Sequence, residues 1–264
     1  MDTLEKGWIQ KLLGLPPVAS AHGQQIDFMI FLLHMLVLVL FIGWGIYFII
    51  VIWKFRARKN HRANYYGTST HVSTYIETSV AIAEAVLLLV FSIPFWAKNV
   101  SALPTEKNPL KIRIVAEQFA WNIHYPGPDG IFGKTDMSHY DKASNPLGLD
   151  LTDPAAQDDV VTLNQLYLPV NRQVLIYLSS KDVIHSFSLN IMRVKQDAVP
   201  GMVIPLWFTP IKAGKSEIAC AQLCGLGHYR MKGYLTVLPM EEFDKWLAEQ
   251  SAAAKSSSED SFWN

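Results

Sequence analysis

The sequence predicts an α+β protein anchored in a membrane, built as a transmembrane hairpin of two helices followed by an all-β sandwich with a short C-terminal helix. Two observations lead to this prediction. Apolar residues are concentrated between residues 27 and 97, although the whole chain of 264 residues is only 50% hydrophobic. From residue 110 the sequence changes to short stretches that alternate polar and apolar residues between glycine and proline turns, as β-strands do.

The overall charge and length narrow the classes of function. The chain has a formal net charge of zero, whereas nucleic-acid-binding proteins usually carry a basic patch. Its length fits one large domain or two parts, and the uneven hydrophobicity favours a membrane part joined to a water-soluble part.

We expect the transmembrane hairpin over residues 27–100, with helices at 27–53 and 78–97. The first apolar stretch has no charged residue between its ends, and as a helix it would be about 39 Å long, enough to cross a bilayer with tilt. The second contains Glu84, and Pro94 lies near its far end, where a kink is tolerated. A buried core helix is the alternative for the first stretch, but soluble helices are rarely this long and this apolar on every side.

The connecting loop, residues 54–76, sets the orientation of the hairpin. It begins with KFRARKNHR, which carries five Lys or Arg and no acid, and the positive-inside rule places such a loop in the cytoplasm. The N-terminal segment, residues 1–26, and everything after the second helix are then expected on the periplasmic side of a bacterial cytoplasmic membrane. Residues 19–21 read ASA, which is similar to a cleavage site, but the apolar stretch before them is too short for a convincing signal peptide, so processing stays open.

The exposed domain is expected between residues 110 and 240 as an antiparallel sandwich or a small barrel. An insertion at 126–160 holds seven Asp and two Lys, and is either a solvated loop or an acidic surface that steers a basic partner. Residues 241–264 are expected to form a short helix and a disordered tail. The expected strands are 111–115, 173–180, 215–219 and 233–238.

Both cysteines of the chain lie within one short stretch, CAQLCGLGHYRM, which covers residues 220–231. Two cysteines in an oxidising compartment would form a disulfide by default. Here, however, His228 and Met231 closely follow Cys220 and Cys224, and thiolate, imidazole and thioether are soft ligands suited to copper. The glycines of this stretch allow it to fold tightly around one point. The sequence therefore favours a metal site, with a disulfide as the alternative.

Two further ligands complete the expected site. His185 follows the predicted strand 173–180, whose end neighbouring strands can bring beside the loop, and the backbone carbonyl of Gln222 lies within the loop. Two thiolates can bridge two metal ions, with one histidine on each, Met231 on one and the Gln222 carbonyl on the other. Zinc is the alternative metal, but its usual spacing has both histidines downstream and no methionine. We expect the other histidines to be surface or packing residues, namely His22, His34, His61, His71, His124 and His139.

These residues resemble subunit II of the haem–copper cytochrome c oxidases, with its dinuclear CuA centre. The family's loop pattern, C-x-x-x-C-x-x-x-H-x-x-M, is matched by residues 220–231, and its upstream stretch with the first histidine ligand is matched by residues 182–201. The hairpin, the final helix and the order of the parts also match, so that the resemblance covers about residues 27–250.

The resemblance implies a cupredoxin-like fold for the exposed domain. The resemblance also implies that the chain is a subunit of an aerobic, proton-pumping respiratory oxidoreductase. In this role the chain accepts electrons from cytochrome c, or from a cytochrome c domain of another complex, and passes them to the haem of subunit I, where oxygen is reduced to water. No residue that catalyses oxygen reduction is expected in this chain. The donor's identity, the haem types and a larger supercomplex stay open. The implied ligands of the two copper ions are His185, Cys220, Gln222, Cys224, His228 and Met231.

The chain departs from the family pattern at three positions. Gln222 stands where a Glu usually also binds magnesium, and because a neutral amide oxygen is a weaker ligand for a hard cation, magnesium at the subunit interface is doubtful. The family's tryptophan for electron uptake falls on Phe119 and a second falls on Trp121, so electrons are expected to arrive by either, or by another route. Met202 replaces an arginine, which removes a positive charge near the subunit interface.

Two acids of the second helix are candidates for a proton path. Glu77 matches the acid that the family places at the mouth of a proton channel, and the alternative is an acid favoured by the helix dipole. Glu84 lies about 10 Å further along the helix, where an ionisable group is costly and suggests a function. It matches no family residue, because Pro is usual there, and a polar group of subunit I is its expected partner.

Three other interpretations are alternatives to this resemblance. A membrane-tethered copper chaperone needs an exchangeable, usually single-copper site, whereas two bridging thiolates favour retention. Quinol oxidase subunits share the fold but lack the copper ligands, and a structural subunit with a plain disulfide would have no free thiol. The sequence has no C-x-x-C-H motif for covalent haem, so the electron donor must be separate.

Overall fold

The computed structural model describes residues 5–57, 65–67, 70–100, 104 and 106–261. The chain divides into two compact units. The helical unit covers residues 25–102, and the β unit combines residues 1–24 with residues 103–264. Most of the basic stretch of the predicted cytoplasmic loop, residues 58–64, lies outside the described residues.

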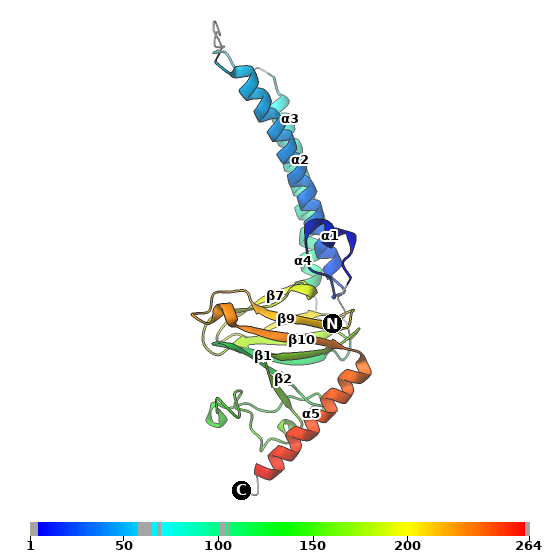
Figure 1. Ribbon diagram of the computed structural model, residues 1–264, viewed down its shortest axis with the longest axis vertical. Helices are drawn as coiled ribbons and strands as arrows, with labels where there is room; N and C mark the ends of the chain where they lie inside the picture. The colour runs from blue at the N-terminus through cyan, green and yellow to red at the C-terminus, as the bar shows by residue number, and fades with distance from the viewer. Residues whose placement is uncertain (1–4, 58–64, 68–69, 101–103, 105, 262–264) are drawn as a thin grey trace. The chain divides into compact units, whose positions relative to one another are not determined.

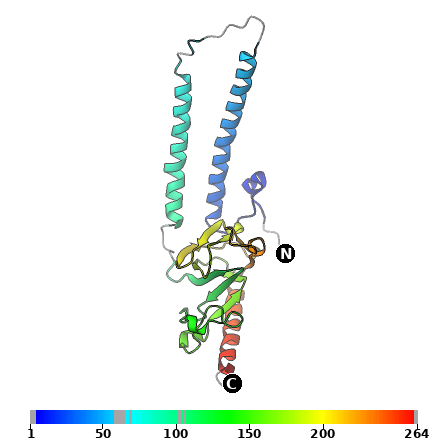
Figure 2. The same ribbon diagram turned by 90° about the vertical axis from the view of Figure 1, so that its left-hand side faces the viewer.

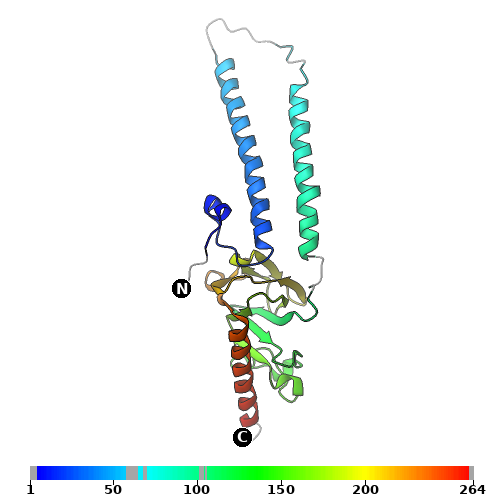
Figure 3. The ribbon, with the colours of Figure 1, turned by 90° about the vertical axis from the view of Figure 1, so that its right-hand side faces the viewer.

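The helical unit contains the predicted hairpin. Its first helix is α2 (Gly23–Phe55), and its second runs through α3 (Val72–Val86), a π-helical turn η1 (Leu87–Ser92) and α4 (Ile93–Val100). Figures 2 and 3 show them as two long, separate rods. Both are long and apolar enough to span a membrane, with mean hydropathies of 2.8 and 2.2, and they contain the expected spans. A short helix, α1 (Trp8–Leu13), precedes them.

Near Pro94, where a kink is tolerated, the second helix contains the π-helical turn η1. Proline has no backbone N–H, and its ring clashes with the carbonyl of the residue four positions earlier in a regular helix. The turn η1 ends two residues before Pro94, and the N–H of Ile93 donates to the carbonyl of Leu88, five residues back. The wider turn therefore precedes the proline in the helix.

The β unit consists of two sheets of five strands each. The first has the order β3-β2-β1-β5-β8 and the second the order β4-β10-β9-β6-β7. The first sheet is built from β1 (Leu110–Glu117), β2 (Ala120–Tyr125), β3 (Val160–Leu163), β5 (Val174–Ser180) and β8 (Ile204–Phe208). The second is built from β4 (Gln165–Pro169), β6 (His185–Leu189), β7 (Val194–Ala198), β9 (Gly214–Cys220) and β10 (Lys232–Leu238).

The sandwich is mixed rather than purely antiparallel, which corrects the prediction. The strands β1 and β5 pair in parallel, as do β4 and β10. One strand of each pair, β1 or β10, is labelled in Figure 1. The four predicted strands are present as β1, β5, β9 and β10, and the other six were not predicted. Strand β6, for example, alternates serine with Phe187 and Leu189, but it is only five residues long and is buried at every position, so that its polar residues do not mark an exposed face.

The core lies between the two sheets and includes part of the N-terminal segment. Ile112 and Ile114 of β1 are fully buried, and Leu235 of β10 belongs to the same cluster. Ala19 joins this cluster, and its backbone N–H donates to the Ile191 carbonyl at 2.8 Å. The stretch that is similar to a cleavage site is therefore packed into the β unit.

The C-terminal helix is longer than predicted. Helix α5 runs over Met240–Ser261, so that the segment expected to be a disordered tail is helical as far as Ser261. Residues 252–255 are alanines and a lysine, which are strong helix formers. The buried Ser251 donates through Oγ to the carbonyl of Asp158 at 2.6 Å, which ties the helix to the insertion.

Candidate metal centre

The six predicted ligands come from the ends of neighbouring strands in the second sheet. His185 is the first residue of β6, Cys220 is the last residue of β9, and Met231 immediately precedes β10. The remaining three lie in the loop between β9 and β10. Gly225 in this loop has a φ of 128°, a conformation that side chains rarely allow, so that the tight turn depends on a glycine here. Strand pairing thus places the ligands at one end of the sandwich.

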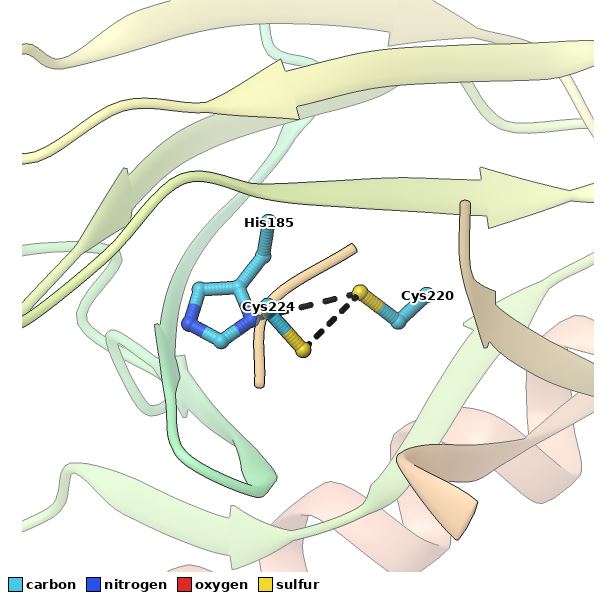
Figure 4. A group of neighbouring side chains, drawn as sticks. All are labelled: His185, Cys220 and Cys224. Carbon is cyan, nitrogen blue, oxygen red and sulfur yellow. Dashed lines mark hydrogen bonds between the residues drawn. The ribbon is translucent and has the colours of Figure 1, made fainter. Parts of the chain in front are cut away.

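The donor atoms of these residues converge on one point. The sulfur atoms of Cys220 and Cys224 are 3.8 Å apart, and His185, Cys220 and Cys224 turn their side chains toward one another (Figure 4). The Nδ1 of His185 lies 3.9 Å from the Cys220 sulfur, and the Gln222 carbonyl oxygen lies 3.2 Å from it. The Nδ1 of His228 is 3.6 Å from the Cys224 sulfur, and the Met231 sulfur is 3.7 Å from it.

Both cysteines are free thiols, so that the disulfide interpretation does not describe this structure. Cys224, Met231 and His185 are buried, which keeps water away from one side of the cluster. Burial, together with the neighbouring Cys220, raises the pKa of the Cys224 thiol to about 11. A bound metal ion must therefore displace protons from the sulfur atoms before it is coordinated.

Asp182 binds the ring nitrogen of His185 that does not face the sulfur atoms. Its Oδ1 accepts a hydrogen bond from Nε2 of His185 at 2.9 Å, which leaves Nδ1 facing the sulfur atoms. Its Oδ2 accepts from the backbone N–H of Gln118 at 2.7 Å. Partial burial alone would raise the pKa of Asp182, but the hydrogen bonds from His185, Gln118 and Val183 outweigh it and lower that pKa. A carboxylate that binds the second nitrogen of a histidine ligand fixes the tautomer and ring orientation.

The turn between β1 and β2 closes the other side of the loop. The side-chain amide of Gln118 donates to the carbonyl of Cys224 at 2.7 Å. A Cβ added at Gly227 would lie 2.6 Å from Cγ and Cε2 of Phe119, so that this ring is in close contact with the loop backbone. Trp121 is fully buried, and its ring centroid lies 6.2 Å from that of His185.

Sequence reasoning did not identify Asp182 and Gln118 as part of the site. Asp182 could have been found, because histidine ligands commonly donate their second ring N–H to a carboxylate and Asp182 lies three residues before His185, whereas the role of Gln118 needs the fold. Among the described residues, the structure brings no other histidine to the cluster: His124 binds Asp159 at 2.7 Å, and His139 lies 3.8 Å from Asp150, while His61 lies outside the described residues. Glu77 and Glu84 belong to the helical unit.

The fold and the site together define a class of protein, a membrane-anchored β-sandwich with a cluster of soft donors suited to a metal. Residues 110–237 match the family model described as cytochrome c oxidase subunit II, periplasmic domain. The chain is 31% identical over 204 residues to the alternative cytochrome c oxidase subunit 2 of Bradyrhizobium diazoefficiens, covering 77% of this chain and 72% of that protein. The chain therefore belongs to the cytochrome c oxidase subunit II family, which confirms the predicted resemblance.

Other relatives are similar over most of the chain. A probable cytochrome c oxidase subunit 2 of Rickettsia bellii is 28% identical over 245 residues, which cover 92% of this chain and 85% of that protein. The crystal structure of the periplasmic domain of subunit II of cytochrome oxidase from Bradyrhizobium japonicum is similar with 28% identity and a TM-score of 0.42, covering 57% of this chain and 99% of that one. As a member of this family, the protein is a membrane-anchored subunit of a respiratory cytochrome c oxidase.

Proposed function

We propose that the β unit carries a dinuclear copper centre of the CuA type, which accepts electrons from cytochrome c and passes them to the haem of subunit I in a haem–copper oxidase complex. One observation carries this proposal: two free thiols, two imidazole nitrogens, a thioether and a carbonyl oxygen lie within 3.9 Å of a cysteine sulfur. Oxygen reduction and proton pumping would take place in other subunits. The family membership supports this division of roles.

The donor set fits copper. His185 and the Gln222 carbonyl lie beside the Cys220 sulfur, whereas His228 and Met231 lie beside the Cys224 sulfur. These six residues would hold the ions, with two thiolates, two imidazoles and two weaker donors between them. A thioether and a thiolate pair favour copper over zinc, whose usual sites lack methionine. When bound, such a pair of ions would supply one-electron exchange with little change in bond lengths.

The positions of two aromatic rings support a route for the electrons. Trp121 cannot touch an external protein because it is fully buried, but its ring lies beside that of His185. Phe119 is only partly buried and lies against the metal-binding loop. Leu226 and Tyr229 of the same loop are 97% and 86% exposed, which offers a partner an apolar contact. Electrons are therefore proposed to arrive near Phe119 and to reach His185 past Trp121.

The acidic insertion has a structural role in addition to its proposed role in docking a basic cytochrome c. Each of its seven aspartates accepts a hydrogen bond from a backbone N–H of the insertion, so that the carboxylates hold its turns. Asp136, Asp141 and Asp150 have pKa values below the ordinary value because of hydrogen bonds from Ser138, Ser144 and Thr152. They remain charged at neutral pH, which supports electrostatic steering.

The remaining parts of the prediction concern the membrane. We propose that the helical hairpin lies in a bacterial cytoplasmic membrane with the β unit on the periplasmic side. Glu84 lies near the middle of the span Val72–Lys98 and has an exposed side chain, which is consistent with a partner in subunit I. The roles of Glu77 and Glu84 in a proton path stay predictions. Magnesium is not proposed, because Gln222 offers no carboxylate.

The proposal is tested by the copper content and the electron paramagnetic resonance spectrum of the complex purified in detergent. We expect two copper ions per chain, with one unpaired electron shared over both nuclei. One copper ion with a localised spin would instead indicate a blue-copper or chaperone site, and purification without a haem-bearing subunit would favour the chaperone. A copper-free protein with Cys220 oxidised to Cys224 would overturn the proposal.

Replacing Asp182 by Asn is expected to weaken copper binding by about 10- to 100-fold, the range seen when outer partners of metal ligands are lost. The reason is that the His185 ring would lose its charged acceptor, so that Nδ1 would no longer be held toward the sulfur atoms. The measurements are copper affinity by competition with a chelator and the spectrum of the loaded complex. Asp197→Asn is the control, because the Asp197 side chain is half exposed and its contact within the described residues is a 4.0 Å ion pair with Lys195. An unchanged affinity and spectrum would show that Asp182 does not position the ligand.

A further inference from the structure

A cavity of about 520 Å³ is lined by the outer face of the first sheet and by the insertion, residues 126–160. The strand register explains its polar floor. Arg113 of β1 stands opposite His124 of β2 on one side and Tyr177 of β5 on the other. Because successive residues of a strand face opposite sides, these side chains turn away from the core residues Ile112 and Ile114. None of the six proposed copper ligands lines this cavity.

The charges in the cavity wall are of one sign. Lys111 and Arg113 line it, and among the described residues no Asp or Glu does. Lys111 is exposed and forms no ion pair within the described part of the chain. The Arg113 guanidinium is held in place, since it lies 4.2 Å from the centroid of the Phe132 ring and donates to the Gly133 carbonyl at 3.5 Å. Two cations therefore face a cavity that supplies no carboxylate of its own.

The acid whose charge acts on Arg113 is Asp159, and its carboxylate is already hydrogen-bonded within the protein. Asp159 is buried, and its Oδ2 accepts hydrogen bonds from Nε2 of His124 at 2.7 Å and from the Gly133 N–H at 2.8 Å. Burial lowers the pKa of Arg113, and the charge of Asp159 opposes this effect only in part. The guanidinium is thus partly desolvated, a state in which contact with an anion is favourable.

The wall also offers hydrogen-bond donors that are not used within the protein. The hydroxyl groups of Thr135, Tyr177 and Ser179 line the cavity, and none of them makes a hydrogen bond among the described residues. His124 lines it too, but its ring is not counted among these donors, because its Nε2–H is already donated to Asp159. Cations and donors gathered without a carboxylate are the arrangement that binds carboxylate or phosphate groups.

We propose that this cavity binds a small amphipathic organic anion. Its phosphate or carboxylate group lies against Lys111 and Arg113, and its apolar part lies against Phe132, Leu147 and Val203, which complete the wall. The volume is within the range of roughly 300–1,000 Å³ that is typical of small-molecule sites. A bare phosphate would leave most of it empty. The proposal does not depend on copper, because the cavity and the metal cluster share no residue.

The test is calorimetric titration of the purified complex with phenyl phosphate, which joins a phosphate to an apolar ring. We expect it to bind more tightly than inorganic phosphate or benzyl alcohol, each of which offers only half of the required chemistry. Lys111→Gln should weaken binding by about tenfold, as expected for loss of one charge-assisted hydrogen bond. Leu147→Trp fills the apolar end of the cavity and should abolish the binding of phenyl phosphate. Lys215→Gln is the matched control, because Lys215 is an exposed lysine of β9 that does not line the cavity.

A second arm of the experiment distinguishes the sources of the anion. If a lipid headgroup is the natural occupant, vesicles of phosphatidylglycerol will compete with phenyl phosphate and vesicles of phosphatidylcholine will not, whereas a soluble metabolite predicts no competition by either. Both results support an anion site. Binding that is absent from the wild-type complex, or equal in the wild type and both cavity variants, would overturn the proposal. Cross-linking of Lys111 to an acidic residue of another subunit would also overturn it, because the cavity would then be a protein interface.

Discussion

Replacing Cys220 or Cys224 by Ser is expected to abolish the proposed dinuclear centre and to reduce electron uptake from cytochrome c by more than about 100-fold, beyond the loss typical of outer partners of a ligand. Each sulfur lies between two other donors, and the two sulfurs are only 3.8 Å apart. A serine hydroxyl stays protonated and cannot bridge two soft metal ions. Copper content, the resonance spectrum and the rate of cytochrome c oxidation are the measurements.

The two cysteine variants serve as controls for each other. If both thiolates bridge, the two substitutions will give the same loss of both copper ions. If only one substitution removes copper and the other leaves a localised copper signal, the site is mononuclear and the proposed function is wrong. Ala219→Ser, on the same strand beside Cys220, shows whether an added hydroxyl at this end of β9 by itself disturbs the fold.

Replacing Gly227 by Ala is expected to lower the free energy of unfolding by about 1–3 kcal/mol, the usual cost of overpacking. The backbone allows alanine, since φ at Gly227 is −92°. The cost arises because the added Cβ would lie 2.6 Å from Cγ and Cε2 of Phe119, so that either the ring or the metal-binding loop must move. Thermal denaturation of the complex measures the stability, and chelator competition measures the accompanying loss of copper.

A second substitution shows whether this contact is the cause. Phe119→Ala removes the ring and should recover most of the stability that Gly227→Ala loses, as a double-mutant cycle would reveal. Gly45→Ala is the matched control, because an added Cβ there would meet no atom within 4 Å. If Gly227→Ala lowers the free energy of unfolding by the same amount in the wild type and in the Phe119→Ala background, the strain lies elsewhere in the loop.

The sequence by itself determined the two long apolar helices, the β-rich exposed part and the family, and it predicted the donor residues of the proposed copper centre. A long continuous apolar stretch identifies a membrane span, because a helix that crosses a bilayer must be apolar along its whole length in the hydrocarbon. Donor type and close spacing identify the loop of residues 220–231, since five of the six proposed donors lie within these twelve residues. Signals of this kind are local, so that they can be read without knowing which strands pair. The resemblance to the oxidase family rests on the same local pattern.

Only the tertiary structure decided which distant residues support those donors. Gln118 reaches Asp182 across 64 positions and Cys224 across 106, through strand pairings that no local pattern encodes. The parallel pairing of β1 with β5 likewise depends on the whole sandwich, and it is this pairing that brings Arg113 beside Tyr177 at the cavity. The burial of Trp121 and the helical C-terminal segment follow from the same packing. Contacts between distant segments are set by burial of the shared core, and this is why the support of the site became visible only in the folded protein.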